Sequence, residues 1–144
     1  MKLSGTVYAS KKPPLESEIQ KQILTWLKLK GIFHFRNNTM GVMRNGRWTK
    51  SPNTTKGAAD IIAIKNSFRV KYPAPTHEHF NDIANGREEQ PKTELVGILV
   101  AIECKRLGAK QTEEQKAFQE NVEKHGGIYI LAYSCNDVRA VFEQ

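Results

Sequence analysis

An acidic and a basic side chain stand two residues apart at the end of the most apolar run in the chain. Residues 97–104 form this run, whose short length and β-branched content predict a buried strand, and Glu103 and Lys105 lie at its end. Alternation along a strand places both side chains on one face. Buried charge is costly unless it is paired or binds a metal, so this placement is typical of a functional site. The alternative is an ordinary ion pair on a half-exposed strand.

Two more carboxylates are predicted at the ends of elements. Asp60 precedes the apolar strand 61–64 and follows small residues, which would let a second backbone or a phosphodiester come close. Glu16 lies in the first turn of a helix predicted over 15–30, on the inward edge of its apolar face, whereas Glu18 faces solvent. The alternatives are a turn residue for Asp60 and simple helix-dipole partners for both glutamates.

A divalent cation would join these groups into one site. If strands 61–64 and 98–105 pair, Asp60 and Glu103 could supply the oxygen ligands that Mg²⁺ or Mn²⁺ prefers. Lys105 could then orient an attacking water and counter the charge that grows on a phosphate. The pattern therefore predicts metal-assisted hydrolysis of a phosphodiester.

The positive charge of the chain is concentrated in one interval. The net charge is +7, yet no acidic residue lies between Glu18 and Asp60. The basic residues of that interval are Lys21, Lys28, Lys30, Arg36, Arg44, Arg47, Lys50 and Lys56. This distribution is expected for a protein with a polyanionic partner such as a nucleic acid, and the alternative is a merely solvated basic loop.

The Asn-Gly pair at 45–46 is a strong hairpin signal within this interval. Arg44, Arg47 and Lys50 flank the turn, with Trp48 among them. Cations beside an aromatic ring suit phosphate contact together with stacking on an unpaired base. The alternative is a surface ribbon on which Trp48 folds back.

The order of the elements predicts an α/β fold. Strands are expected at 32–36, 61–64, 97–105 and 128–133, and helices at 15–30, at 112–124 and at the C-terminal end, where Asn136 and Asp137 would cap the last helix. The two close neighbours in the middle of the chain should pair antiparallel, and the helix that follows them should cross over to a parallel strand. The sequence therefore predicts a mixed central β-sheet flanked by helices in one domain, 1–144, with a tail over 1–12 and an insertion over 67–93.

Gln115 has two predicted roles. Thr112-x-x-Gln115 fits the capping box, in which the glutamine side chain reaches back to the amide of the cap residue. Gln115 also shares a helical stripe with Phe118 and Val122 that should face the sheet. A structural cap and an active-site group are therefore both open.

Composition limits the class of protein. The chain is 39% hydrophobic and 26% charged, which is ordinary for a globular domain. No run approaches the ~18–20 apolar residues of a membrane span, so we expect no membrane partner. Cys104 and Cys135 build neither a disulfide framework nor a metal site, and Cys104 is expected to be a core thiol of a cytoplasmic protein.

Taken together, these residues resemble the PD-(D/E)xK nuclease superfamily and, within it, the VRR-NUC family. The resemblance is carried by Glu16-x-x-Ile19-Gln20, Asn37-Asn38, Gly57-x-x-Asp60, Glu103-x-Lys105, Gln115 and the glycine pair at 126–127. It spans roughly residues 14–134, the insertion excepted. It implies a restriction-endonuclease-like core, with the insertion between the second and third core strands, and Mg²⁺- or Mn²⁺-dependent phosphodiester hydrolysis.

The same resemblance implies residue roles. Asp60 and Glu103 would ligate the metal with help from Glu16, Lys105 would be catalytic, and Gln115 would lie in the active site. Stand-alone members of the family look like structure-selective DNA nucleases, including junction-resolving ones, and such compact forms are common in phages. Symmetric cutting of a four-way junction needs two matched active sites, so that activity would require a homodimer.

We therefore expect a metal-dependent endonuclease that acts on branched or single-stranded DNA in the cytoplasm, which for a phage-encoded protein is that of the host. The predicted nucleic-acid-binding residues are Arg36, Asn37, Asn38, Arg44, Arg47, Trp48, Lys50 and Lys56. One alternative is a non-catalytic nucleic-acid-binding module that keeps the nuclease fold. Another is a basic scaffold protein whose acidic residues are all caps and turns.

Overall fold

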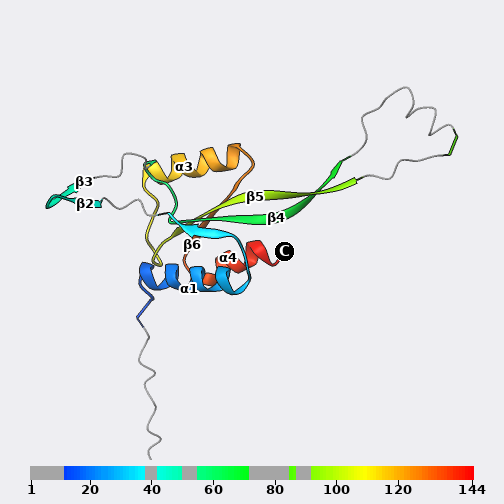
Figure 1. The fold of residues 1–144 in the computed structure, drawn as a ribbon. Helices are drawn as coiled ribbons and strands as arrows, with labels where there is room; N and C mark the ends of the chain where they lie inside the picture. Colours follow the sequence, from blue (N-terminus) through cyan, green and yellow to red (C-terminus); the bar gives the residue numbers. More distant parts are fainter. Residues whose placement is uncertain (1–11, 38–41, 50–54, 72–84, 87–91) are drawn as a thin grey trace, which may run out of the picture.

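A computed structural model describes residues 12–37, 42–49, 55–71, 85–86 and 92–144 of the chain (Figure 1). Its elements in chain order are α1 (Glu16–Leu29), β1 (His34–Arg36), β2 (Val42–Arg44), β3 (Arg47–Thr49), β4 (Ile61–Lys71), β5 (Lys92–Cys104), α3 (Glu113–Lys124), β6 (Ile128–Ala132) and α4 (Cys135–Phe142). None of the described helices combines the length and the apolar character that crossing a membrane needs.

Four strands form one mixed sheet in the order β1-β4-β5-β6. β4 pairs antiparallel with both β1 and β5, and β5 pairs parallel with β6. Both predicted pairings of the central strand are confirmed, and so is the α/β class with a mixed sheet flanked by helices. The restriction-endonuclease-like arrangement of that sheet stays a prediction.

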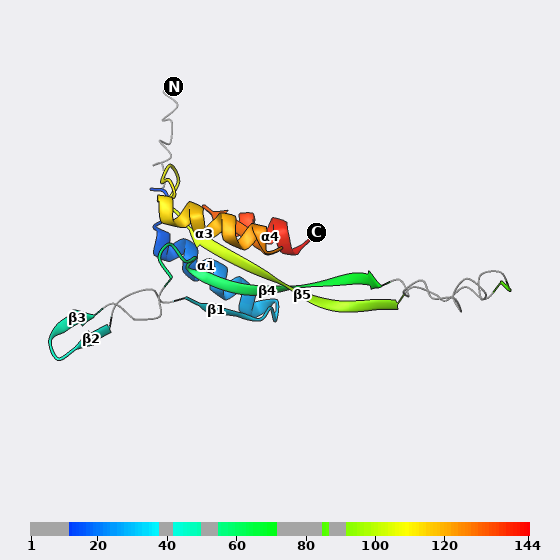
Figure 2. The same ribbon diagram turned by 90° about the horizontal axis from the view of Figure 1, so that it is seen from above.

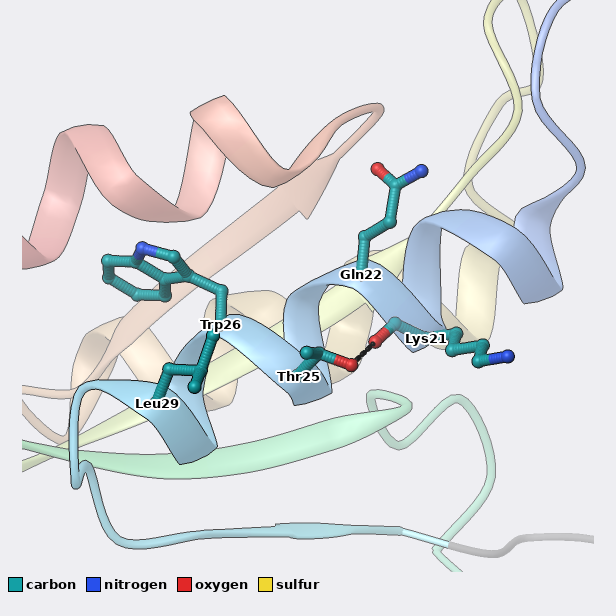
Figure 3. Close-up of a pocket in the computed structure, with 5 residues that line it drawn as sticks. All are labelled: Lys21, Gln22, Thr25, Trp26 and Leu29. Carbon is teal, nitrogen blue, oxygen red and sulfur yellow. Dashed lines mark hydrogen bonds between the residues drawn. The ribbon is translucent and has the colours of Figure 1, made fainter.

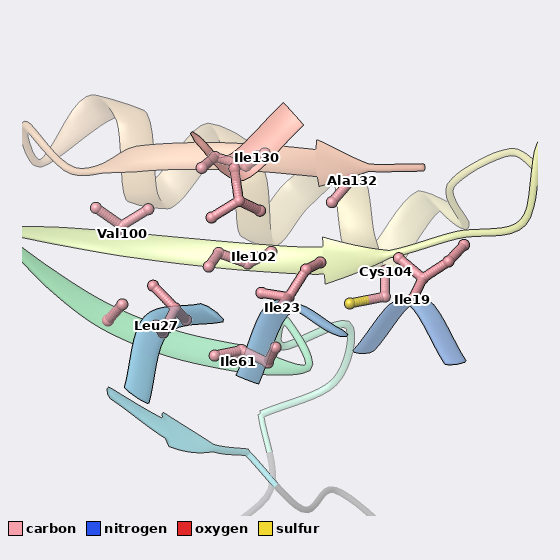
Figure 4. Close-up of a cluster of buried hydrophobic side chains, with 11 residues drawn as sticks. Ile19, Ile23, Leu27, Ile61, Val100, Ile102, Cys104, Ile130 and Ala132 are labelled. Carbon is pink, nitrogen blue, oxygen red and sulfur yellow. The ribbon is translucent and has the colours of Figure 1, made fainter. Parts of the chain in front are cut away.

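Helices lie on both faces of the sheet, with α1 and α4 on one face and α3 on the other (Figures 1 and 2). The apolar periodicity of α1 turns Ile19, Ile23 and Leu27 into the core. From the strands, alternate positions fill the same core with Ile61, Ala63, Val100, Ile102, Cys104, Ile130 and Ala132 (Figure 4). Cys104 is therefore a buried core thiol, as predicted.

The opposite face of the sheet, toward α3, carries the other alternate residues of each strand. Phe118 of α3 packs edge to face against Tyr129 of β6, with ring centroids 6.3 Å apart. Tyr129 is paired across the ladder with Ala101 of β5, which is two residues before Glu103. Glu103 therefore points to the α3 face, away from the main core.

Strand pairing extends into both ends of the insertion predicted over 67–93. β4 continues to Lys71 and β5 begins at Lys92, and the two strands pair along this whole length as a long ribbon (Figure 2). Residues 67–71 alternate apolar and polar side chains, a strand pattern that the prolines further along obscured. Apart from a short turn, residues 72–91 lie outside the described part of the chain.

The caps of the two C-terminal helices were predicted with different success. Thr112 is the N-cap of α3, as predicted. Ser134 is the N-cap of α4, and the Asp137 carboxylate accepts the backbone N–H groups of Ser134 at 2.8 Å and of Tyr133 at 2.9 Å. The predicted capping by Asp137 is therefore confirmed, because its carboxylate completes a capping box from the first turn, whereas the N-cap residue itself is Ser134.

The predicted Asn-Gly hairpin is confirmed. β2 and β3 pair antiparallel as a separate two-stranded sheet. Both turn residues, Asn45 and Gly46, have positive φ, 51° and 72°. A two-residue turn of this kind matches the right-handed twist of the strands that it joins.

Candidate metal and catalytic site

Glu103, the last residue but one of β5, is a buried carboxylate with one oxygen occupied and one oxygen free. The residue is only 3% exposed. Its Oε1 accepts from the Lys105 ammonium at 3.1 Å and from the Gln115 side-chain amide. Its Oε2 is buried without a hydrogen-bond partner among the described residues. An unpartnered buried carboxylate oxygen is unfavourable, so Oε2 is an oxygen that could hold a cation.

Gln115 of α3 is both a helix cap and a partner of Glu103. Its Oε1 accepts the backbone N–H of Thr112 at 2.9 Å, and its Nε2 donates to Glu103 Oε1. The hydrogen bond from Thr112 therefore fixes the orientation of the Gln115 side-chain amide, so that its NH₂ group faces the Glu103 carboxylate. The two roles that the sequence left open are compatible, because each uses a different end of one side-chain amide.

β4 brings Asp60 beside Glu103. The register pairs Ile61 with Ile102, so the next cross-strand position sets Asp60 opposite Glu103. Asp60 Oδ2 accepts the backbone N–H of Cys104 at 2.9 Å, which anchors this carboxylate at the end of β5. The two strand ends that were predicted to meet therefore do so, with one acid on each.

Asn37, directly after the edge strand β1, holds the backbone on either side of the Asp60 position. Its backbone N–H donates to Asp60 O at 2.7 Å, and its side-chain Nδ2 donates to Ala59 O at 3.0 Å. The sequence singled out Asn37 as a nucleic-acid contact and missed this positioning role. The signal for it was an asparagine at a strand end, where its side chain commonly bonds nearby backbone.

Gly57 lets the loop before Asp60 lie directly against the start of α3. Its φ is +73°, and a Cβ atom built here would lie 2.2 Å from the carbonyl oxygen of Glu114 and 2.6 Å from the backbone nitrogen of Gln115. The small residues before Asp60 were expected to admit a second backbone or a phosphodiester. The backbone that they admit is the one that carries Gln115, so loop and helix position each other.

The environment of Glu103 raises the pKa of its carboxyl group to about 7. Burial is the main cause, and the neighbouring negative charge of Asp60 adds to it. The hydrogen bond and the positive charge of Lys105 act in the opposite direction, and Glu16 contributes a small further increase. A divalent cation bound between the two carboxylates would offset this repulsion.

Without metal, the free energy of unfolding is expected to decrease as the pH rises from about 4.5 to about 7. In this window the folded protein binds more protons than the unfolded chain, because Glu103 titrates near 7 when folded and near 4.5 when unfolded. One pKa unit corresponds to about 1.4 kcal/mol, so the decrease is at most about 3–4 kcal/mol. Denaturant unfolding in EDTA at several pH values measures it.

The control for this pH dependence is Glu103→Gln, which keeps the shape of the side chain and cannot ionise. The difference between wild type and variant isolates Glu103 from every other titrating group. If the two proteins show the same slope across this window, Glu103 does not have the raised pKa.

Glu16 is exposed in the first turn of α1, and its negative charge reaches Glu103, where it slightly raises the pKa of the carboxyl group. Its predicted help in holding a metal stays a prediction. The neighbouring Glu18 is a cap, because its carboxylate accepts the backbone N–H of Leu15 at 2.8 Å. Among the described residues, no group of three or more His, Cys, Asp or Glu side chains is arranged to hold a metal. A site here rests on Asp60 and Glu103.

The predicted nucleic-acid-binding residues are only partly described. Arg36, Arg47 and Lys56 are exposed. Asn38 and Lys50 lie outside the described residues, and so do the side chains of Arg44 and Trp48. The described cations are accessible to a polyanion, and the hairpin residues stay a prediction.

Tyr129 is a neighbour of the site that the sequence analysis missed. Its hydroxyl is buried, and burial, with a smaller contribution from the charges of Glu103 and Asp60, raises its pKa to about 12. The phenol therefore stays protonated at neutral pH. Strand alternation alone could have placed it on the α3 face, since β6 runs parallel to β5.

A shallow hollow on the outer side of α1 is separate from this site. It has a volume of about 300 Å³ and is lined by Lys21, Gln22, Thr25, Trp26 and Leu29 (Figure 3). None of the predicted catalytic or metal-binding residues lines it.

Comparison of the chain with protein-family models, curated proteins and solved structures finds no significant match. The site is therefore interpreted from its own geometry.

Proposed function

We propose that this chain is a Mg²⁺- or Mn²⁺-dependent deoxyribonuclease that hydrolyses phosphodiester bonds, with Asp60 and Glu103 as the metal ligands. The observation that carries the proposal is Glu103 Oε2, a buried carboxylate oxygen with no partner among the described residues, across a strand pair from a second acid. A buried ion pair alone would not explain it, because Lys105 and Gln115 both use the other oxygen.

The donor set fits a hard divalent cation. Mg²⁺ and Mn²⁺ prefer oxygen ligands and are commonly held by one or two carboxylates together with water and substrate phosphate. Asp60 and Glu103, which end adjacent paired strands, supply these carboxylates. When bound, such an ion supplies positive charge for a phosphate oxygen and lowers the pKa of a water molecule.

The remaining residues of the site orient its parts. The Lys105 ammonium, 12% exposed and 3.1 Å from Glu103 Oε1, is placed to orient an attacking water and to counter charge on the phosphate. Gln115 holds Glu103 Oε1 and so directs Oε2 away from the helix. Asn37 fixes the backbone that carries Asp60.

DNA is the proposed substrate because of the position of the positive charge. The interval between Glu18 and Asp60 carries only basic charges and leads directly into the site. Exposed cations there suit phosphate contacts, which position a nucleic acid without reading its sequence. We propose branched or single-stranded DNA as the substrate, and a homodimer if a symmetric junction is cut.

The test is cleavage of junction, flap, nicked, single-stranded and duplex DNA, and of RNA, in Mg²⁺, Mn²⁺ or EDTA. We expect products only with a divalent ion, and loss of products in Asp60→Asn, which can still accept the Cys104 N–H. DNA binding with a steep salt dependence but without any metal-dependent cutting would replace the proposal with the non-catalytic binding module. Neither binding nor cutting would leave a basic scaffold.

A further inference from the structure

Two phenylalanines on the edge strand are exposed on the same sheet face as the carboxylates. Phe33 is 69% exposed and Phe35 is 50% exposed. Phe35 pairs with Ile62, and Ile62 pairs with Ala101, which stands two residues before Glu103 on β5. Directly opposite residues point to the same face, so Phe35 and Glu103 share the α3 face of the sheet.

Phe33 lies at the next position on the same sheet face, two residues before Phe35. Its carbonyl accepts the backbone N–H of Ile64 at 3.0 Å, so the pairing of the edge strand extends to it. His34, between the two phenylalanines, pairs with Ala63 of the main core and therefore points to the other face. Seen along the sheet, the order from the site is Asp60, then Phe35, then Phe33.

α3 does not cover this part of the face. The helix packs on β6 through Phe118 and reaches β5 through Gln115, whereas β1 lies at the far edge of the sheet (Figure 2). Half-buried Ile62 and Ile64 and the 42% exposed Leu99 form the apolar floor beside the two rings. Contiguous exposed apolar groups are informative, because they mark binding surfaces more often than isolated ones do.

The spacing of the two rings fits an unstacked strand of nucleic acid. Successive residues on one face of a strand are about 7 Å apart, about twice the rise per nucleotide in a duplex. Bases on both rings must therefore be unstacked from each other and unpaired. Sheet aromatics that stack splayed bases are a recurrent way to bind single strands.

Charge favours a nucleic acid as the occupant of this face. The edge strand belongs to the interval that holds only basic charges. Arg36, the last residue of β1, is exposed, and so is Lys56 in the turn before Asp60. Cations beside stacked rings contact the phosphates that link the bases.

We propose that Phe35 and Phe33 form a stacking platform for unpaired nucleotides next to the phosphate that the site cleaves. The proposal rests on the proposed function for the location of that phosphate, and it specifies the substrate class as DNA with an unpaired strand. Phe35, which pairs with Ile62 two residues after Asp60, stacks on the base nearer to the cleaved phosphate, and Phe33 stacks on the next base.

The test compares a short oligodeoxythymidine of about six nucleotides with an abasic strand of the same length by fluorescence anisotropy in EDTA. The two strands carry the same phosphates, so any difference in affinity comes from the bases. Wild type should bind the thymidine strand about tenfold more tightly. Phe35→Ala should remove most of this preference, and Phe35→Trp should keep it.

Phe68→Ala is the matched control. Phe68 is 71% exposed on the same face of the β4–β5 ribbon, but about 20 Å further from the site than Phe35. Its removal should leave the preference for bases unchanged. A wild type that binds both strands equally would falsify the platform, and so would Phe35→Ala with an unchanged preference.

A second copy of the chain is the other partner that could cover this apolar face. Phe35→Ala distinguishes it from a nucleic acid. If Phe35→Ala turns a dimer into a monomer in sedimentation and no base preference exists, the face is a protein interface and the platform is rejected. The assay needs no cleavage, so a failure of the nuclease proposal leaves its result standing. Equal binding of the two strands by a protein that does cut DNA rejects the platform alone.

Discussion

Glu103→Gln is expected to reduce DNA cleavage by about a thousandfold or more while DNA binding remains. The substitution keeps the shape of the side chain but removes the charge of the proposed metal ligand, whose Oε2 has no hydrogen-bond partner among the described residues. Loss of several kcal/mol of transition-state stabilisation corresponds to this factor, since about 1.4 kcal/mol is tenfold in rate. Single-turnover cleavage with saturating protein measures the chemical step, and anisotropy in EDTA measures binding.

The same variant should be more stable than wild type at pH 8 without metal. At that pH the wild-type carboxylate is ionised in a buried place beside Asp60, whereas glutamine is neutral. A variant that loses activity while it gains stability cannot have lost activity by unfolding. This combination separates a role in catalysis from a role in folding.

Glu113→Gln is the matched control for Glu103→Gln. Glu113 lies at the start of the same helix as Gln115, but its side chain is 87% exposed and forms an ion pair with Lys116, at 2.8 Å. Exposed ion pairs contribute little, so its loss should change cleavage and stability only slightly. If Glu113→Gln reduced cleavage as much as Glu103→Gln, the buried carboxylate would have no special role.

Gly57→Ala is expected to lower the free energy of unfolding by roughly 3–4 kcal/mol and to abolish cleavage. A Cβ atom at 2.2 Å from a backbone carbonyl oxygen cannot be accommodated without moving either the loop or α3. Alanine at a φ of +73° adds backbone strain. Either movement separates Gln115 from Glu103 or shifts Asp60, so the site is lost with the contact.

Gly31→Ala distinguishes the clash from the backbone strain. Gly31 has a similar φ of +66°, but nothing lies within 4 Å of a Cβ atom built there. We expect it to cost about 1 kcal/mol and to leave cleavage intact. Denaturant unfolding of both variants, with cleavage at a temperature where both are folded, gives the comparison. If both variants lost the same free energy of unfolding and the same cleavage activity, the contact of Gly57 with α3 would be unimportant.

Local patterns in the sequence were sufficient for most of the fold. Hydrophobic periodicity predicted α1 and its core residues, and apolar runs predicted β4, β5 and β6 with the correct pairing directions. The Asn-Gly turn and the Thr112 cap were predicted because a few adjacent residues determine them. The errors arose where neighbouring signals competed. The prolines after residue 71 obscured the ends of the β4–β5 ribbon. The N-cap of α4, Ser134, was not recognised because the polar residues Asn136 and Asp137 follow it closely.

The candidate site was predicted in part for the same reason. A carboxylate at the end of an apolar strand is visible in the sequence, so Asp60, Glu103 and Lys105 could be named and their strands expected to pair. The role predicted for Glu16 stays a prediction, since the structure describes Glu16 as an exposed residue of the first turn of α1 whose charge reaches Glu103. The positioning role of Asn37 and the place of Tyr129 beside the site were missed, since both depend on partners far along the chain.

The sequence by itself determined which residues alternate onto which face, and therefore that an acid and a base emerge together from a core strand. Only the tertiary structure decided that one oxygen of Glu103 is occupied by Lys105 and Gln115 while the other has no partner in the described part of the chain. It also decided that α3 covers the β5–β6 side and leaves Phe33 and Phe35 exposed. The physical reason is that alternation is a property of a single strand, whereas burial and hydrogen-bond partners depend on where distant helices pack.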